Sequence, residues 1–283
     1  QVLLDAGFSP NVSDENGYVP LHTAVWGEYF EIIDLLAESG VDLNIRDSTG
    51  NSSLHHAADS GLAKVVGHLI ELGADLEARN HDGTTPFEVA MCLGDPEIVR
   101  LFLRKGVDPN TVLSGNQYPL NVAVAVQDVE IVQAILDAGG DIFQCDEDSD
   151  LILEQALEIA STTKMNENEV VALLVSKYEE AAGFVYEIDR LIDRLEESKK
   201  IDLITELVDG GLSVDFVDDS NCSLLHKAAS AGRTKLAKNL LLMGASVEKM
   251  DNRSWTPLHH SILSNSLHTI RVWVQLQRVN AGS

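Results

Sequence analysis

Apolar and small residues recur along this chain with a constant step of 33 residues. The helix starts that keep this step are Pro20, Ser53, Pro86 and Pro119, each followed by an apolar residue, and the glycines that keep it are Gly40, Gly73, Gly106 and Gly139. A period of this size is typical of stacked helical hairpins, in which each repeat buries its apolar face against its neighbours. The pattern therefore predicts one elongated array, although a chain of 283 residues would otherwise suggest two globular domains.

Each repeat is expected to hold a turn and two helices. The turn is an Asp-x-x-Gly sequence, as at 14–17, in which Gly is free to take a positive φ. A first, short helix starts at a Pro that follows a capping Thr, as in Thr85-Pro86, and ends at a Gly such as Gly94. The second helix carries apolar residues at helical spacing, as at 32–36. An extended Asp-apolar-Asn stretch, at 42–44, is then expected to lead into the next turn.

The repeats divide the chain into four stretches. Residues 1–13 look like the end of an earlier repeat, 14–146 hold four regular repeats, and 218–283 hold two more, the last one ragged. Between them, 147–217 fit two divergent repeats, an insertion, or a stretch from which residues are missing. About eight repeats are expected in all, in what we interpret as a fragment of a longer protein.

The divergent stretch still predicts helices. They are expected near 151–160, 170–177, 181–196 and 201–208. In the third of these, five apolar residues fall on one helical face: Phe184, Ile188, Leu191, Ile192 and Leu195.

These repeats resemble ankyrin repeats over about 14–146 and 218–263. The residues that carry the resemblance are Leu54-His55, Gly73-Ala74-Asp75, Gly244-Ala245-Ser246 and Thr256-Pro257-Leu258-His259. The resemblance implies an all-α solenoid of stacked helix–turn–helix repeats with β-hairpin-like turns. It also implies that the four histidines at one repeat position hydrogen-bond neighbouring turns and do not bind metal: His22, His55, His226 and His259.

The amino-acid composition limits the classes of partner that the chain is expected to bind. The chain has 45 acidic and 20 basic residues, a formal net charge of −25. This charge disfavours nucleic acid and anionic membranes and favours a basic protein segment, unless the acidity serves solubility alone. The sequence has no apolar run long enough to span a membrane. Its cysteines, Cys92, Cys145 and Cys222, lie far apart, which suggests reduced thiols in the cytoplasm, with the nucleus or a host-cell cytosol as alternatives.

Catalytic and metal-binding motifs are missing from the sequence. It contains no Gly-rich phosphate loop, nucleophile elbow or CxxC motif, so we expect no enzyme, no cofactor and no metal. The acidic run at 146–150 resembles the start of a calcium loop. However, Leu151 and Leu157 stand where such a loop needs Gly and Glu, so the run is interpreted as a solvated turn.

The resemblance implies where a partner would bind. In ankyrin arrays the turn tips and the outer edge of the first helices line a concave groove, at positions expected to carry no structural duty. In this chain they are Glu15, Asn16, Tyr18, Trp26, Ser48, Thr49, Asn51, Asp59, Ser60, His81, Asp82, Thr84, Cys92, Leu93, Gln117, Ala125, Val126, Asp219, Cys222, Ser230, Asn252, Arg253, Trp255 and Leu263. Tyr18 with Trp26 is the predicted hot spot and Trp255 a second, unless Trp26 packs on an earlier repeat.

The expected function is that of a scaffold which holds a peptide or protein domain in this groove, with acidic flanks that attract a basic partner. The alternative is a regulatory or targeting arm of a larger protein, such as a channel, a trafficking adaptor, an enzyme or a bacterial effector.

Overall fold

The computed structural model describes residues 9–143, 152–163, 169–180, 188, 190–192, 194–195, 203–265 and 270–271. Helices and turns make up this part of the chain, and its extended pairing is limited to two isolated antiparallel bridges, Arg46 with Ser52 and Val217 with Ser223. The predicted all-α class with hairpin-like turns is therefore confirmed, while the number of repeats stays a prediction. The chain divides into two compact units, Gln1–Ile152 and Leu153–Ser283.

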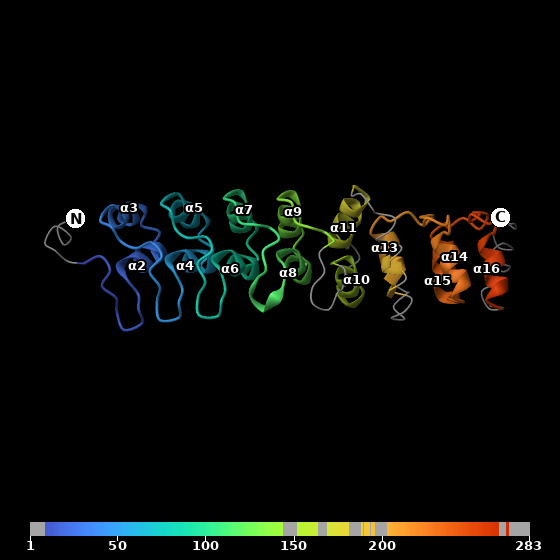
Figure 1. Ribbon diagram of the computed structural model, residues 1–283, viewed down its shortest axis with the longest axis horizontal. Helices are drawn as coiled ribbons and strands as arrows, with labels where there is room; N and C mark the ends of the chain where they lie inside the picture. The colour runs from blue at the N-terminus through green and yellow to red at the C-terminus, as the bar shows by residue number, and fades with distance from the viewer. Residues whose placement is uncertain are drawn as a thin grey trace. The chain divides into compact units, whose positions relative to one another are not determined.

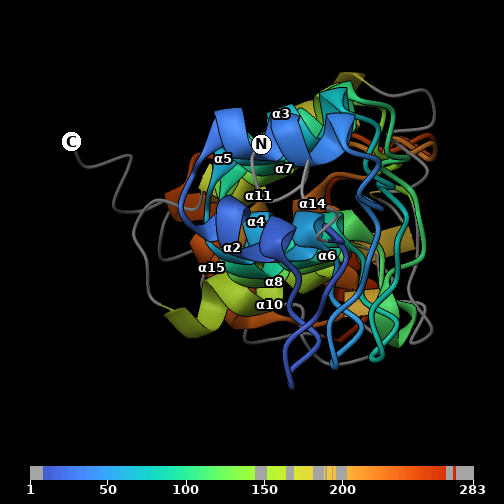
Figure 2. The same ribbon diagram turned by 90° about the vertical axis from the view of Figure 1, so that its left-hand side faces the viewer.

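The described residues of the first unit form four pairs of helices. They are α2 (Pro20–Trp26) with α3 (Phe30–Glu38), α4 (Ser53–Asp59) with α5 (Ala63–Glu71), α6 (Pro86–Leu93) with α7 (Pro96–Arg104), and α8 (Pro119–Val126) with α9 (Val129–Asp137), and a short 3-10 helix, Ser114–Asn116, precedes α8. The first helices α2, α4, α6 and α8 pack side by side in one row, and the second helices lie in another (Figure 1). Figure 2 shows the two rows from the N-terminal end, with the turns beyond the first-helix row.

The core of this unit lies between the rows and between successive repeats. The residue after each helix start is at most 1% exposed in all four repeats: Leu21, Leu54, Phe87 and Leu120. Ala57 and Ala58 are fully buried, which lets the short α4 approach its neighbours closely. The predicted helix ends are also found, since the Thr85 hydroxyl accepts a hydrogen bond from the Glu88 N–H at 3.2 Å and Gly94 takes φ 75°.

The Asp-x-x-Gly turns form as predicted. Asp47 Oδ1 accepts hydrogen bonds from the N–H groups of Thr49 (2.8 Å) and Asn51 (3.0 Å), and Gly50 takes φ 83°. The prediction of an extended stretch at 42–44 is wrong. There the Asp42 carboxylate accepts the Asn44 N–H at 2.9 Å, because a short acidic side chain can close a turn on its own backbone.

The second unit contains the divergent stretch from residue 153 onward. Its described helices are α10 (Ile152–Thr163), whose first residue belongs to the other unit, α11 (Glu169–Glu180), α13 (Ile204–Asp209), α14 (Leu224–Ser230), α15 (Thr234–Leu242) and α16 (Pro257–Leu263). The helices predicted near 151–160, 170–177 and 201–208 are therefore confirmed, with small shifts of their ends.

The predicted face of the 181–196 helix is confirmed where the structure describes it. Its described residues Ile188, Leu191, Ile192 and Leu195 are helical and at most 1% exposed. Phe184, Cys145 and the acidic run at 146–150 lie outside the described residues. Within the part of the chain that the structure describes, no helix has both the length and the apolar character needed to cross a bilayer.

Candidate functional site

The predicted binding residues lie on turns and on first helices, a surface that we call the turn-side face. Within each unit this face consists of the exposed parts of the first helices, which are α2, α4, α6, α8, α14 and α16, and of the turns that precede them. None of the predicted residues is buried. Four of the main candidates are half-buried, namely Tyr18, Asn51, Thr84 and Trp255. The others are exposed, namely Glu15, Asn16, Trp26, Thr49, Asp59, His81, Asp82, Leu93, Gln117, Val126 and Arg253.

The structure brings Tyr18 and Trp26 together, as the sequence predicted. Their ring centroids are 4.9 Å apart in an edge-to-face arrangement. His56 from the next repeat completes the cluster, 5.1 Å from the Trp26 ring and 5.8 Å from the Tyr18 ring. Trp26 nevertheless remains 41% exposed. A large aromatic side chain is thus held in place while much of its surface faces solvent.

A buried carboxylate lies beneath this aromatic cluster. His56 Nε2 is 2.9 Å from Asp47 Oδ2, and the Asp47 side chain is 1% exposed. Burial alone would raise the pKa of Asp47, but hydrogen bonds from Thr49, Asn51 and His56 outweigh it and lower that pKa. Asp47 is therefore an anion at neutral pH, and the cluster has a negative charge beneath it.

The second unit contains a similar arrangement around Trp255. His260 contacts the Trp255 ring edge-on at 5.8 Å, and the Arg253 guanidinium lies 5.9 Å from the centre of that ring. His260 Nε2 is 2.9 Å from Asp251 Oδ2. Burial would raise the pKa of Asp251, but hydrogen bonds from the Trp255 N–H, His260 and the Arg253 N–H lower it to about 2.

A basic side chain nine residues after the turn aspartate is the signal that the sequence analysis missed. At this spacing His56 contacts Asp47 and His260 contacts Asp251. At the corresponding position of another repeat, Lys227 Nζ lies 3.4 Å from Asp218 Oδ2. The signal is visible in the sequence, but only the structure shows that the two side chains meet.

The expectation that these positions carry no structural duty is wrong for several of them. The carbonyl oxygens of Asn16, Thr49, Thr84 and Trp255 each accept a hydrogen bond from a neighbouring repeat, at 2.9, 3.1, 2.9 and 3.0 Å. Asn51 Oδ1 also accepts a hydrogen bond from Asn80 Nδ2 at 2.9 Å. The physical reason is that stacked turns remove backbone groups from water, and each of these groups then needs a partner.

The predicted role of the shared histidine is confirmed at His55 and His226. His55 Nδ1 accepts the Ser52 N–H at 3.1 Å, so its proton is on Nε2, which donates to the Thr84 carbonyl at 2.9 Å. His226 makes the same pair of bonds, with Ser223 and Trp255. Burial is the main cause that lowers the pKa of both histidines and of His22, so they are neutral at pH 7.

A set of possible metal ligands that the sequence analysis did not find lies beside Trp255. Ligand atoms of Cys222, Asp251 and His260 all lie within 4.8 Å of one another. Burial and the carboxylates of Asp218 and Asp251 raise the pKa of Cys222, so its free thiol is protonated at neutral pH. Elsewhere, a surface cavity of about 360 Å³ opens between α7 and α9, in the second-helix row and away from the turn-side face. It is lined by Arg100, Leu103, Arg104, Ala134, Asp137 and Ala138.

Comparison with known proteins agrees with this architecture. The family model for ankyrin repeats (3 copies) matches residues 1–80, 42–112 and 195–281, which together make up more than half of the chain. The chain therefore belongs to the ankyrin-repeat family, whose repeats generally mediate protein–protein interaction and whose members are typically binding scaffolds without enzymatic activity.

Two curated relatives share a shorter segment. Ankyrin repeat and SOCS box protein 3 from Bos taurus is 33% identical over 64 residues, and the protein of the same name from Homo sapiens is 33% identical over 63 residues. Each match covers 22% of this chain, and the chain spans 12% of the length of these relatives.

Proposed function

We propose that this chain is a scaffold that binds a basic protein segment on its turn-side face, with Tyr18 and Trp26 as the main anchor. The observation that carries the proposal is the 41% exposure of Trp26 in a cluster that fixes its ring. The aromatic contacts with Tyr18 and His56 restrict the ring before any partner arrives. A pre-positioned aromatic side chain loses little conformational entropy on binding, which favours affinity.

Charge supports a basic partner. Exposed acidic residues on the same face include Glu15, Asp59 and Asp82, and the whole chain carries a formal net charge of −25. Complementary charge raises the rate of encounter and selects among partners, and salt screens the effect. We place the interaction in the cytoplasm, where the unpaired thiols of Cys92 and Cys222 remain reduced.

The test compares the parent chain with a double variant, Tyr18→Ala with Trp26→Ala. Both are titrated with Arg- and Lys-rich peptides and with acidic peptides of the same length, at low and high salt. Partners captured from a cell lysate and identified by mass spectrometry then supply the natural sequence for the same titration. Loss of an aromatic hot spot costs at least about 2 kcal/mol, so binding should weaken by roughly 30-fold or more.

The matched control is Ile32→Ala. Ile32 is 46% exposed and belongs to the same repeat, but it lies on α3 in the second-helix row. This variant should bind as the parent does, and circular dichroism should show the same helix content in all three proteins. Equal binding by the parent and the double variant would refute the role of the Tyr18–Trp26 pair, and a preference for acidic peptides would refute the basic partner.

A second candidate function is that of a targeting arm within a larger protein. Its support is that the curated relatives carry a name that joins ankyrin repeats to a SOCS box, while this chain spans 12% of their length. Sequencing the transcript on both sides of this segment tests the idea. An encoded catalytic, membrane-spanning or adaptor module would support it, and a reading frame that codes for nothing beyond ankyrin repeats would contradict it.

A further inference from the structure

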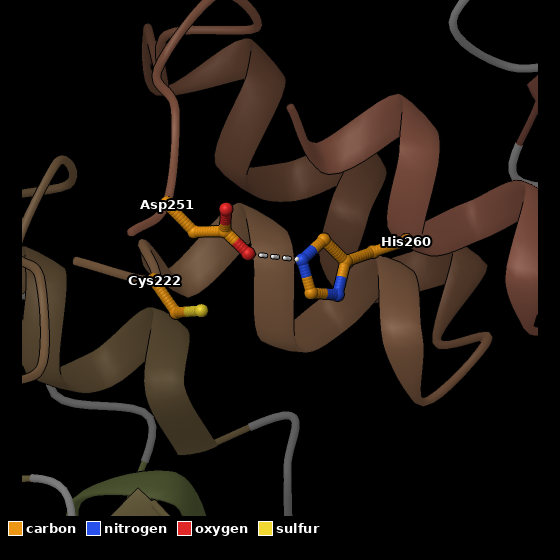
Figure 3. A group of neighbouring side chains, drawn as sticks. All are labelled: Cys222, Asp251 and His260. Atoms are coloured by element: carbon orange, nitrogen blue, oxygen red, sulfur yellow. Dashed lines mark hydrogen bonds and ion pairs between the residues drawn. The ribbon is translucent and has the colours of Figure 1, made fainter. Parts of the chain in front are cut away.

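Three side chains from separate parts of the sequence converge in the unit Leu153–Ser283. Cys222 lies in the turn before α14, Asp251 lies in the next turn, and His260 lies on α16. Figure 3 shows the thiol and the carboxylate on one side and the imidazole opposite them. The ligand atoms all lie within 4.8 Å of one another, and Asp251 Oδ2 is 2.9 Å from His260 Nε2.

The three donors match the preference of zinc. A thiolate, an imidazole nitrogen and a carboxylate oxygen are the groups that bind Zn²⁺ in proteins, and three protein ligands with a water molecule form an open tetrahedral site. Bond lengths of about 2.0 Å to nitrogen and oxygen and about 2.3 Å to sulfur place the donor atoms of such a site about 3.2–3.6 Å apart. The Asp251–His260 distance is close to that range, and a movement of the Cys222 thiol by about 1 Å would close the set.

The carboxylate is already fixed in its position. Asp251 Oδ1 accepts the N–H groups of Arg253 and Trp255 at 2.8 and 2.9 Å, which leaves Oδ2 directed at His260. Such bonds are the kind of support that orients metal ligands in known sites. The site is also accessible, because the His260 side chain is 17% exposed and Cys222 is half-buried.

The basic residues beside the site leave its donors available. Lys227 is engaged by Asp218, with Nζ 3.4 Å from Oδ2, and the Arg253 guanidinium lies 5.9 Å from the centre of the Trp255 ring. The carboxylates of Asp218 and Asp251 add negative charge next to Cys222. A divalent cation would therefore enter a site where acidic groups are close to the donors.

The first unit provides an internal comparison. Asp47 and His56 form the same carboxylate–imidazole pair at 2.9 Å, but Tyr18 stands in the repeat where Cys222 stands in the second unit. The Asp–His pair thus occurs in both units, and the Cys222 thiol is the donor that adds a third possible metal ligand in the second unit. It also follows that a tyrosine at this position is compatible with the fold.

We propose that Cys222, Asp251 and His260 bind a zinc ion, with a water molecule in the fourth position. On binding, the Cys222 thiol loses its proton to solvent and coordinates as the thiolate. The proton on His260 Nε2 moves to Nδ1, so that Nε2 coordinates, and Asp251 contributes a carboxylate oxygen. The ion would join two successive turns to α16 and would keep one position open for a donor atom from a bound partner.

The test uses Co²⁺ as a spectroscopic substitute for zinc, in a chain where Cys92→Ser and Cys145→Ser leave Cys222 as the remaining thiol. Titration of this chain with Co²⁺ should give one equivalent of binding, with thiolate-to-cobalt charge-transfer absorption in the near ultraviolet and the intense visible bands of a tetrahedral ion. Zn²⁺ should displace the Co²⁺ and remove both signals. Zn²⁺ should also raise the melting temperature of this chain.

The control variant adds Cys222→Tyr, which copies the residue of the first unit. We expect it to fold with the same helix content, to lose the charge-transfer band completely and to show no shift of melting temperature with Zn²⁺. The proposal is overturned if saturating Co²⁺ gives no charge-transfer band in the parent. It is equally overturned if the tyrosine variant keeps the melting shift, because the ion would then bind elsewhere. These readouts are independent of partner binding, so either result leaves the proposed scaffold function to its own test.

Discussion

Mild acid should destabilise the folded chain through its buried neutral histidines. His22, His55 and His226 are at most 1% exposed, and burial is the first cause that lowers the pKa of each. In the unfolded chain a histidine titrates near its ordinary value of about 6.5. Below that pH the unfolded state takes up protons that the folded state does not, so the free energy of unfolding decreases. The contribution of these histidines to the free energy of unfolding is fully present above about pH 6.5 and is lost as the pH falls below that value.

The structure sets the size of the effect at His55. Its Nδ1 accepts the Ser52 N–H, so protonation would place two N–H groups against each other and break the bond. If His55 stays neutral in the folded state, the free energy of unfolding is therefore lower at pH 5.5 than at neutral pH by up to about 1.4 kcal/mol. The aspartates contribute over a different range, because the lowered pKa values of Asp47 and Asp251 matter only as the pH falls below about 4.

The matched variant is His55→Gln. Ser52 and residue 55 form a capping box, and Gln is one of the residues that normally fill its third position, so the local bond to Ser52 is kept without a titrating group. Both proteins also carry Trp255→Phe and Trp273→Phe, which makes Trp26 the fluorescent reporter of the first unit. Urea titrations at pH 7.5 and pH 5.5 then give the free energy of unfolding of that unit. Contributions from groups other than residue 55 are shared by the two proteins and cancel in the difference.

The expected result is that the parent loses up to about 1.4 kcal/mol more than His55→Gln between the two pH values. An identical pH dependence in the two proteins would refute the assignment of His55 as a buried neutral donor. A parent that becomes more stable at pH 5.5, relative to the variant, would mean that the folded state prefers the protonated imidazole, against the hydrogen bonds seen here.

Two further predictions concern packing and turn geometry in the first unit. Phe102→Ala removes a fully buried ring that lies 6.0 Å from the Phe87 ring, edge to face. This variant should lose about 3–5 kcal/mol of the free energy of unfolding in urea titrations. The control Val112→Ala changes a side chain that is 45% exposed and should alter the same quantity by less than about 0.5 kcal/mol. A comparable loss in both variants would contradict the buried position of Phe102. Gly50→Ala and Gly83→Ala both place Ala at φ near 80°. A Cβ on residue 50 would lie 2.7 Å from the His81 backbone N, whereas a Cβ on residue 83 would have none of the described atoms within 4 Å. Gly50→Ala should therefore be the less stable by about 1 kcal/mol or more in the same titration, and equal costs would argue against close stacking of these two turns.

The pattern of the sequence was sufficient for the fold class and for most of the local structure. Helix starts at Pro20 and Pro86, the Asp-x-x-Gly turns and the glycine helix ends depend on residues a few positions apart, and their chemistry acts within one repeat. Repetition strengthened each of these signals, because the same local pattern appears several times in phase. The stretch at 42–44 was misread because an aspartate can close a turn on its own backbone as readily as it can precede a strand.

Part of the candidate site was also readable from the sequence. The repeat positions of Tyr18 and Trp26 assigned them to one predicted hot spot, and the structure brings their rings together, with Trp26 exposed and Tyr18 half-buried. Their role in binding stays a prediction. The structural use of the Asn16, Thr49 and Thr84 carbonyls was not predicted, because side-chain identity says little about which backbone groups a neighbouring repeat will cover.

The sequence by itself thus determined the repeat and, through the repeat, the family, because both depend on periodic, short-range chemistry. The tertiary structure alone decided which side chains from different repeats meet. His56 reaches the Trp26 cluster, and Cys222, Asp251 and His260 converge, because stacking places residues about one repeat apart at neighbouring positions in space. For Trp26 with His56 and for Cys222 with Asp251, that distance along the chain is too long for a local motif. The spacing of nine residues between Asp251 and His260 is visible in the sequence, but only the structure shows that these two side chains meet.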